Sequence, residues 1–472
     1  MNDTKFFRLL ASLSTYERKR LRRYLCSPLH NEEKTFIALY DIVAPYLVDA
    51  NTTVTRETIG KKLFTKKKMS NLDYARLFTN FTRRIEGFMS LEKYYSQPVR
   101  EYTDLLESFN ERHLDKYFPD MYQYVSKLHS RVPAGSGDYY LDTFRIEALQ
   151  HGHLEALQQR STHKNLLETL NALDIFYLVT KLRYCAAMLH YQEFLSLEGD
   201  VALIQEILRY CADGRYNSVP LLRAYYYTVM SLIEPDKEEH FAAMKEIIFA
   251  NIGHLAPDTL RDLFAFAIVY CINKINRGDA GYQRQIFELY KQSLASDILL
   301  SDGKLSPWDF KNIVTIALRN KEFKWTDTFI DDYVKKLPKA EQQNALTFNR
   351  ARYFFATKKY DKVLDLLQDV EYSDIFYLLD SKTTLMKTYY ELGEYQPLQS
   401  LKESFRILLR RKKLISEQNQ TNYGNFARFT MKLYRIDVKN KKQIATLRKE
   451  IDATGNVADR SWIMEKLEEV SG

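Results

Sequence analysis

Residues 345–367, ALTFNRARYFFATKKYDKVLDLL, align with residues 380–402, DSKTTLMKTYYELGEYQPLQSLK, at an offset of 35 residues. Five large side chains recur: Phe354, Phe355, Tyr360, Val363 and Leu366 in the first segment, and Tyr389, Tyr390, Tyr395, Leu398 and Leu401 in the second. A period near 34 residues is typical of helical hairpins that stack into a solenoid. The sequence therefore predicts an all-α protein that contains an α-solenoid of helical hairpins.

The rest of the chain fits a mostly helical protein with several parts. Its 472 residues are 45% hydrophobic and 28% charged, with only 15 Gly and 11 Pro, too few turn residues for a β-rich fold. A weaker third repeat places Phe323 and Phe329 37 residues before Tyr360 and Leu366. The clearest loop is PAGSG at 133–137. We predict a basic N-terminal helical bundle (1–97), an irregular helical-hairpin region (98–300), and repeats with a C-terminal capping helix (301–472).

Several helix starts are visible in the sequence. Ser14 and Glu17 have the spacing of a capping box, and Ser306-Pro307 offers a cap followed by a first-turn proline. Residues 98–132 predict one or two helices interrupted at Pro119, and residues 166–197 predict one long helix. The last predicted helix, near 461–470, carries Trp462 and is expected to cap the array, because a solenoid must cover its terminal apolar face.

Positive charge is concentrated at the N-terminus. Residues 1–100 hold 19 Lys and Arg against 10 Asp and Glu, whereas the remaining residues hold 50 against 51. This asymmetry suggests an acidic partner for the first part of the chain, such as nucleic acid or the ribosome. The candidate anion-binding patch is Arg18, Lys19, Arg22, Arg23, Lys66, Lys67 and Lys68. The alternative is a solubilising surface with no ligand.

The sequence favours a cytoplasmic location. Its four cysteines are scattered without a CxxC pair, which is typical of reduced thiols. The longest apolar run, Leu263 to Ile272, has ten residues, half the length of a membrane-spanning helix. The first 20 residues lack the apolar core of a signal peptide. We therefore expect no membrane partner.

The segments FFATKKYDKVLDLL (354–367) and YYELGEYQPLQSL (389–401) resemble tetratricopeptide repeats. The match is partial, since Val363 and Leu398 stand where such repeats place a small residue, and the closing proline is absent. Four segments also resemble a bacterial family of helical-repeat proteins with no assigned activity. They are LDIFYLVTKLRYC (173–185), YCINKINRG (270–278), YYELGEY (389–395) and WIMEKL (462–467).

The tetratricopeptide resemblance implies a groove lined by the first helix of each hairpin. By position, the groove residues would be Phe348, Arg352, Phe355, Thr383, Lys387 and Tyr390. Arg352 and Lys387 occupy equivalent places one repeat apart and could hold a peptide carboxylate. The alternative is that Phe355 and Tyr390 pack between helices. The basic residues at 406–413 need no ligand, because cations at a helix C-terminus interact favourably with its dipole.

No catalytic motif is present in the sequence. The RGDAG segment at 277–281 lacks the Lys and Ser/Thr that end a phosphate-binding loop, and Gly135-Ser136-Gly137 lacks the full GxSxG spacing. His151 and His153 are two residues apart, so a helix would place them on different faces. We expect no enzyme activity, cofactor or metal. The sequence therefore predicts a non-enzymatic scaffold for protein partners, with nucleic-acid or ribosome binding through the N-terminal bundle as the alternative.

Overall fold

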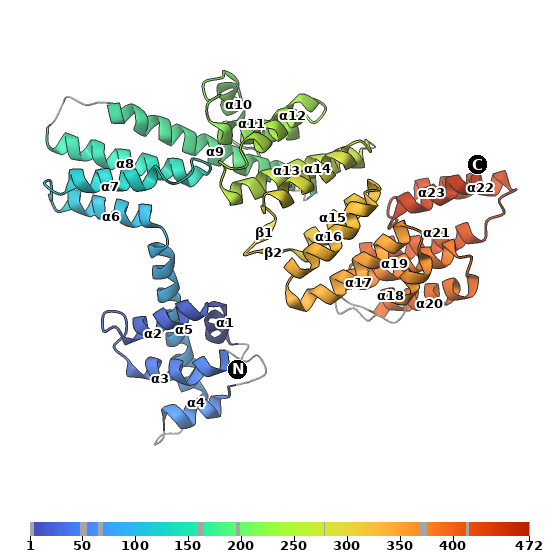
Figure 1. The fold of residues 1–472 in the computed structure, drawn as a ribbon, viewed down its shortest axis with the longest axis horizontal. Coiled ribbons are helices and arrows are strands. Elements are labelled where there is room, and N and C mark those ends of the chain that lie inside the picture. The colour runs from blue at the N-terminus through green and yellow to red at the C-terminus, as the bar shows by residue number, and fades with distance from the viewer. Residues whose placement is uncertain are drawn as a thin grey trace. The chain divides into compact units, whose positions relative to one another are not determined.

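The computed structural model describes residues 4–47, 54–64, 69–158, 164–194, 199–277, 279–367, 375–411 and 415–471. These ranges are helical apart from loops and one two-stranded hairpin, so the predicted all-α class is confirmed (Figure 1). The chain divides into two compact units, Met1–Tyr177 and Leu178–Gly472. The boundary falls inside helix α9 (Lys164–Phe194).

The first unit contains two groups of helices. Its elements before α9 are α1 (Lys5–Ser12), α2 (Thr15–Cys26), α3 (Lys34–Val43), η1 (Ala44–Leu47), α4 (Arg56–Leu63), α5 (Asn71–Tyr95), α6 (Pro98–Glu111), α7 (Phe118–His129) and α8 (Gly137–Ala156). Helices α1–α5 share a core that includes Phe6, Phe36 and Phe81. Helices α6–α8 pack around Val99, Val125 and Ile146.

The predicted capping signals define the helix starts. Ser14 accepts a hydrogen bond from the Glu17 amide at 3.2 Å, and the Glu17 carboxylate accepts one from the Ser14 amide at 2.7 Å. Ser306 likewise caps its helix by accepting from the Trp308 amide. Pro119 was predicted to interrupt a helix. It lies instead in the first turn of α7, where its missing N–H needs no partner.

The second unit is a succession of helical hairpins (Figure 1). After α9 its elements are α10 (Ile204–Ala212), α11 (Pro220–Ile233), α12 (Glu238–Ala250), α13 (Pro257–Asn276), α14 (Tyr282–Ala295), β1 (Leu300–Ser301), β2 (Lys304–Leu305), α15 (Pro307–Arg319), α16 (Phe323–Tyr333), η2 (Val334–Lys336), α17 (Lys339–Ala356), α18 (Tyr360–Leu367), α19 (Ile375–Glu391), α20 (Tyr395–Arg411), α21 (Glu417–Tyr434), α22 (Lys441–Ala453) and α23 (Arg460–Ser471). The antiparallel strands β1 and β2 pair Leu300 with Leu305.

Helices α15–α21 repeat one packing pattern. The two helices of a hairpin contact each other, as in α15 with α16, α17 with α18 and α19 with α20. The first helix of each hairpin also contacts the first helix of the next, so α15 meets α17, α17 meets α19 and α19 meets α21. The second helix packs on the first helix of the following hairpin.

The turns of these hairpins also repeat. Lys321, Lys358 and Gly393 each follow a first helix and adopt the left-handed conformation, with φ of 58°, 56° and 73°. The next amide in each turn donates to a carbonyl five residues back: Glu322 to Ala317, Lys359 to Phe354 and Glu394 to Tyr389. This is the Schellman ending of a helix, in which the left-handed position favours glycine. The 35-residue offset found in the sequence thus separates two turns that have the same backbone geometry.

A pair of substitutions tests the strain in these turns. Because a side chain at φ near +60° costs about 1 kcal/mol, Gly393→Ala should destabilise the α19–α20 hairpin by about that amount. Lys358→Gly should stabilise α17–α18, or change its stability little, because the gain offsets the higher entropy of an unfolded glycine. Native-state hydrogen exchange of the two hairpins measures both effects. Destabilisation of comparable size in both variants would contradict this account.

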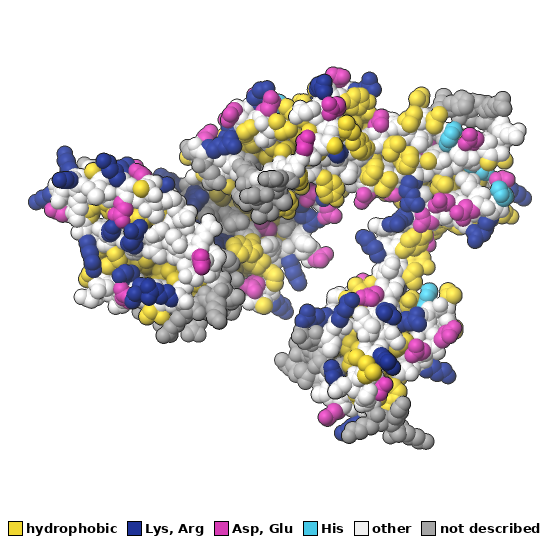
Figure 2. All heavy atoms as spheres, turned by 180° about the vertical axis from the view of Figure 1, so that it is seen from behind, with side chains coloured by type: hydrophobic (Ala, Val, Ile, Leu, Met, Phe, Trp, Pro, Cys, Tyr) yellow, Lys and Arg dark blue, Asp and Glu magenta, His cyan; other side chains and the backbone are white. Residues whose placement is uncertain are grey.

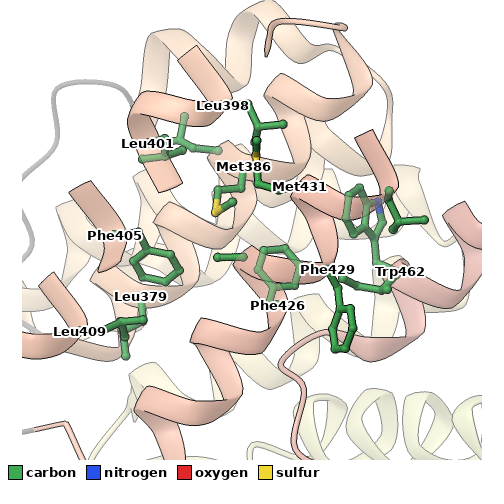
Figure 3. Packing of buried hydrophobic residues seen from close by; sticks show 14 of the residues in the cluster. Leu379, Met386, Leu398, Leu401, Phe405, Leu409, Phe426, Phe429, Met431 and Trp462 are labelled. Atoms are coloured by element: carbon green, nitrogen blue, oxygen red, sulfur yellow. The ribbon is translucent and has the colours of Figure 1, made fainter. Parts of the chain in front are cut away.

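The core of the last hairpins joins residues from α17 to α23. Figure 3 shows Met386, Leu398 and Phe405 facing Phe426 and Met431, with Trp462 packed at one side. Helix α23 matches the predicted final helix and contacts α21 and α22. This core holds the first helices in fixed register and so positions the side chains described next.

Candidate functional site

A cluster of charged side chains lies on the first helices of the C-terminal hairpins. We call it the Arg352 cluster. It consists of Lys311, Thr315 and Arg319 on α15, Arg352 on α17, Asp380 and Lys387 on α19, Tyr423 on α21, and Asp459 just before α23. Helices α15, α17, α19 and α21 pack side by side in that order, which brings together residues from distant parts of the sequence.

Arg352 is held by neighbours but has no carboxylate partner among the residues that the structure describes. Its Nη1 donates to Thr315 Oγ1 at 2.6 Å, and its guanidinium lies 5.6 Å from the ring centre of Phe348. Within the described part of the chain, no carboxylate oxygen lies within 4.0 Å of this guanidinium. Burial lowers its pKa, Arg319 adds to that effect, and Asp380 and Asp459 oppose it. A guanidinium has five donor hydrogens, so Arg352 retains capacity for an anion.

Lys387, the residue predicted to act with Arg352, is already paired. Its Nζ lies 2.6 Å from Asp459 Oδ2 and 4.7 Å from the ring centre of Phe355, and the side chain is only 14% exposed. Burial alone would raise the pKa of Asp459, but Lys387, with further contributions from Arg352 and Arg319, lowers it below its ordinary value. Lys387 therefore binds a carboxylate of this same chain.

Asp380 satisfies a second cation of the cluster. Its Oδ2 lies 2.5 Å from Lys311 Nζ, and its Oδ1 accepts a hydrogen bond from the Tyr423 hydroxyl at 2.7 Å. Burial and the nearby Asp380 raise the pKa of Tyr423, which keeps this hydroxyl a donor. The described cluster thus carries four cations, Lys311, Arg319, Arg352 and Lys387, against two carboxylates. The surplus of two positive charges favours an anionic ligand.

The other predicted groove residues make packing contacts. Phe348 is buried and meets Tyr377 edge-on, and Thr383 is buried and donates to the Leu379 carbonyl. Phe355 and Tyr390 are half-buried. Phe355 packs against Tyr360 at 5.6 Å between ring centres, and Tyr390 lies edge-on to Trp462 at 5.3 Å and to Tyr434 at 5.9 Å. A ligand role for these residues stays a prediction.

The C-terminal helix α23 makes side-chain contacts with α19. Lys466 on α23 lies 2.8 Å from Glu391 on α19, and also pairs with Glu469 in its own helix. Lys387 lies 5.8 Å from the Trp462 ring centre as well as beside Asp459. Sequence reasoning missed Lys311, Asp380 and Asp459, although the spacing of Lys311, Thr315 and Arg319 already places these three on one helix face.

The predicted N-terminal anion patch contains both engaged and exposed cations. Arg18 Nε donates to the Leu13 carbonyl at 2.9 Å, and Arg22 forms two hydrogen bonds to Asp41 at 2.8 and 2.9 Å. The hydrogen bond to Asp41 raises the pKa of Arg22. Lys19 and Arg23 are exposed. Lys66, Lys67 and Lys68 lie outside the described residues.

Comparisons with known protein families, curated proteins and solved structures found no match to this chain. Within the described ranges, no three or more His, Cys, Asp or Glu side chains gather as metal ligands would. No helix in these ranges is both long and apolar enough to cross a membrane.

Proposed function

We propose that residues 301–472 form a tetratricopeptide-like repeat array that binds a protein partner, and that the chain is a non-enzymatic cytoplasmic scaffold. Arg352 receives a carboxylate of the partner, from an acidic side chain or a chain terminus. The recurring helix contacts and left-handed turns of α15–α20 support the repeat architecture. In such an array the aligned first helices offer one continuous surface to an extended peptide.

The observation that carries the proposal is the difference between Arg352 and its neighbours. Lys311, Lys387 and Lys466 each have a carboxylate oxygen within 2.8 Å, whereas the Arg352 guanidinium has a single described hydrogen bond, to Thr315. A planar guanidinium matches a carboxylate with two parallel hydrogen bonds. An incoming carboxylate would complete the pairing of this half-buried cation.

Replacing Arg352 with glutamine should weaken partner binding without unfolding the protein. A hydrogen bond to a charged group contributes about 1.5–3 kcal/mol, so the affinity should fall about ten- to a hundredfold. The tagged full chain is used to capture partners from nuclease-treated lysate of its native cells, and the affinity of a captured partner is then measured by calorimetry. Lys359→Gln is the matched control, because it removes one exposed positive charge from the same hairpin.

Thermal unfolding separates binding from a structural role. Removing a half-buried cation that has no described carboxylate partner should leave the stability of the Arg352→Gln variant unchanged or raised. Equal binding by Arg352→Gln and the parent protein would show that Arg352 is not the anchor. Loss of every partner on nuclease treatment would contradict the protein-scaffold function and favour nucleic-acid binding through the exposed N-terminal cations.

A further inference from the structure

An open cavity with a volume of about 950 Å³ lies between α20, α21 and α22. It is on a different face of α21 from Tyr423. We call it the α21 cavity. Its floor is apolar and comprises Leu409 from α20, Ala427 and Met431 from α21, and Leu447 from α22. Arg352 and the other members of the Arg352 cluster do not line it. The cavity is therefore a separate feature of the last hairpins.

The rim of the α21 cavity is strongly basic. Six cations line it among the residues that the structure describes: Lys402, Arg406, Arg428, Lys432, Arg435 and Lys442. Glu403 lies within 3.0 Å of both Lys402 and Arg406, and Glu450 lies within 3.0 Å of both Arg428 and Lys432. These two carboxylates pair with four of the six cations. Six positive and two negative charges give the rim an excess of four positive charges. Figure 2 shows Lys and Arg side chains gathered beside hydrophobic ones over the C-terminal part of the chain.

The cavity lies where the α21–α22 hairpin is more open than the hairpins formed by α11 to α20. Helices α11 and α12, α13 and α14, and the hairpin pairs from α15 to α20 make extensive contacts with each other, whereas α21 and α22 make few. Glu450 of α22 reaches Arg428 and Lys432 of α21 at 3.0 and 2.6 Å and connects the two helices across the opening. The space left between the helices is not filled by any described side chain.

Gly424 is a second sign that something approaches this surface. It lies in the interior of α21, lines the cavity, and a Cβ placed on it would meet no atom within 4 Å. Glycine weakens a helix interior, and the chain's own packing does not require it here. A glycine at such a position allows the backbone of another segment to come close.

We propose that the α21 cavity binds an amphipathic helix of a partner protein, with an apolar stripe against the floor and acidic residues against the rim. An α-helix with its side chains is about 10–12 Å across, so 950 Å³ accommodates about two turns. Apolar residues at i, i+3 or i+4, and i+7 would face Met431 and Leu447. Flanking Asp or Glu side chains would neutralise the excess charge of the rim.

The composition of the cavity favours a helix over nucleic acid. Single-stranded nucleic acids stack their bases on aromatic rings, and none of the described residues that line the α21 cavity is aromatic. Its apolar floor would contact the hydrophobic face of a helix but offers little to a phosphate backbone. The inference goes beyond the proposed function, since it neither uses Arg352 nor depends on its ligand.

Selection from a displayed library of helical peptides tests the proposal on the full chain. The library varies the flanking positions between acidic, basic and neutral residues around a fixed apolar stripe. Selected peptides should be rich in Asp and Glu, and their affinity, measured by fluorescence anisotropy, should fall as salt rises. A single-stranded RNA oligomer is the second probe.

Two variants with matched controls locate the binding. Gly424→Leu adds a side chain to the lining of the cavity and should reduce the affinity of a selected peptide at least tenfold, whereas Thr421→Leu, exposed on the same helix outside the cavity, should not. Lys442→Glu reverses a rim charge and should reduce the affinity severalfold, whereas Lys441→Glu, its neighbour outside the cavity, should change it little. Circular dichroism confirms that each variant is folded.

Three results would overturn the proposal. They are selection of basic peptides or of none, unchanged peptide binding by the Gly424→Leu variant, and RNA binding that Gly424→Leu abolishes while no peptide binds. Peptide binding lost in Arg352→Gln but retained in Gly424→Leu would assign the peptide to the Arg352 cluster instead. The proposal for Arg352 and the proposal for the α21 cavity can therefore be contradicted independently of each other.

Discussion

Replacement of Trp462 with alanine should lower the free energy of unfolding of the C-terminal hairpins by about 3–5 kcal/mol. The side chain is 6% exposed, and its ring lies 5.3 Å from Tyr390 and 6.0 Å from Phe426, between centres. Figure 3 shows it packed beside Phe429 and Phe426. Alanine would leave a cavity between α19, α21 and α23 that these rigid neighbours cannot fill.

The loss of stability should be local, and the C-terminal end of the array should unfold first. Because Trp462 anchors α23, its removal should expose α23 and the end of α19 to hydrogen exchange while α11–α14 remain protected. Trp462→Phe is the matched control. It keeps an aromatic ring and removes an indole N–H that has no described hydrogen-bond partner, so it should cost less than about 1.5 kcal/mol. Equal destabilisation by phenylalanine and alanine would show that packing of the ring is not the cause.

The sequence predicted those parts of the fold that rest on local patterns. The hairpins of α17–α20 follow from a period that records which side chains must face the core, and the start of α15 follows from Ser306 and Pro307. Helix α8 was not predicted, because its apolar residues form no clear stripe. The β1–β2 hairpin was also missed, although Asp302-Gly303, both with positive φ, is a common two-residue hairpin turn.

The candidate sites were harder to predict because their residues meet only through tertiary packing. The Arg352 position followed from the repeat alignment, but Lys311 and Asp380 are 69 residues apart, and Lys387 and Asp459 are 72 apart. No local sequence pattern indicates that the two residues of such a pair are in contact. The α21 cavity could not be predicted either, because it depends on how far α22 stands from α21, and this distance is set by packing and not by periodicity.

Asp459→Asn should destabilise the C-terminal hairpins by about 3 kcal/mol at pH 7, because it leaves Lys387, only 14% exposed, without its carboxylate. Apart from the charge, asparagine is compatible with this position. Asp459 has a φ of 45°, a left-handed conformation that asparagine adopts as readily as aspartate, and its backbone carbonyl still accepts from the Trp462 amide at the start of α23. The substitution therefore isolates the effect of the charge.

The pH dependence of this difference identifies the ion pair as its cause. The pKa of Asp459 is lowered in the folded protein, so the ionised carboxylate stabilises the fold above the ordinary aspartate pKa of about 3.9. Urea unfolding of both proteins should therefore give a constant difference between pH 7 and pH 5. The difference should shrink as the pH falls below about 4 and vanish once Asp459 is protonated in the folded state. Lys466, whose pKa is raised, loses its contribution only in strongly alkaline solution and does not affect this window. A difference that persists undiminished to pH 2 would mean that the Asp459→Asn substitution disturbs packing and not the charge pair with Lys387.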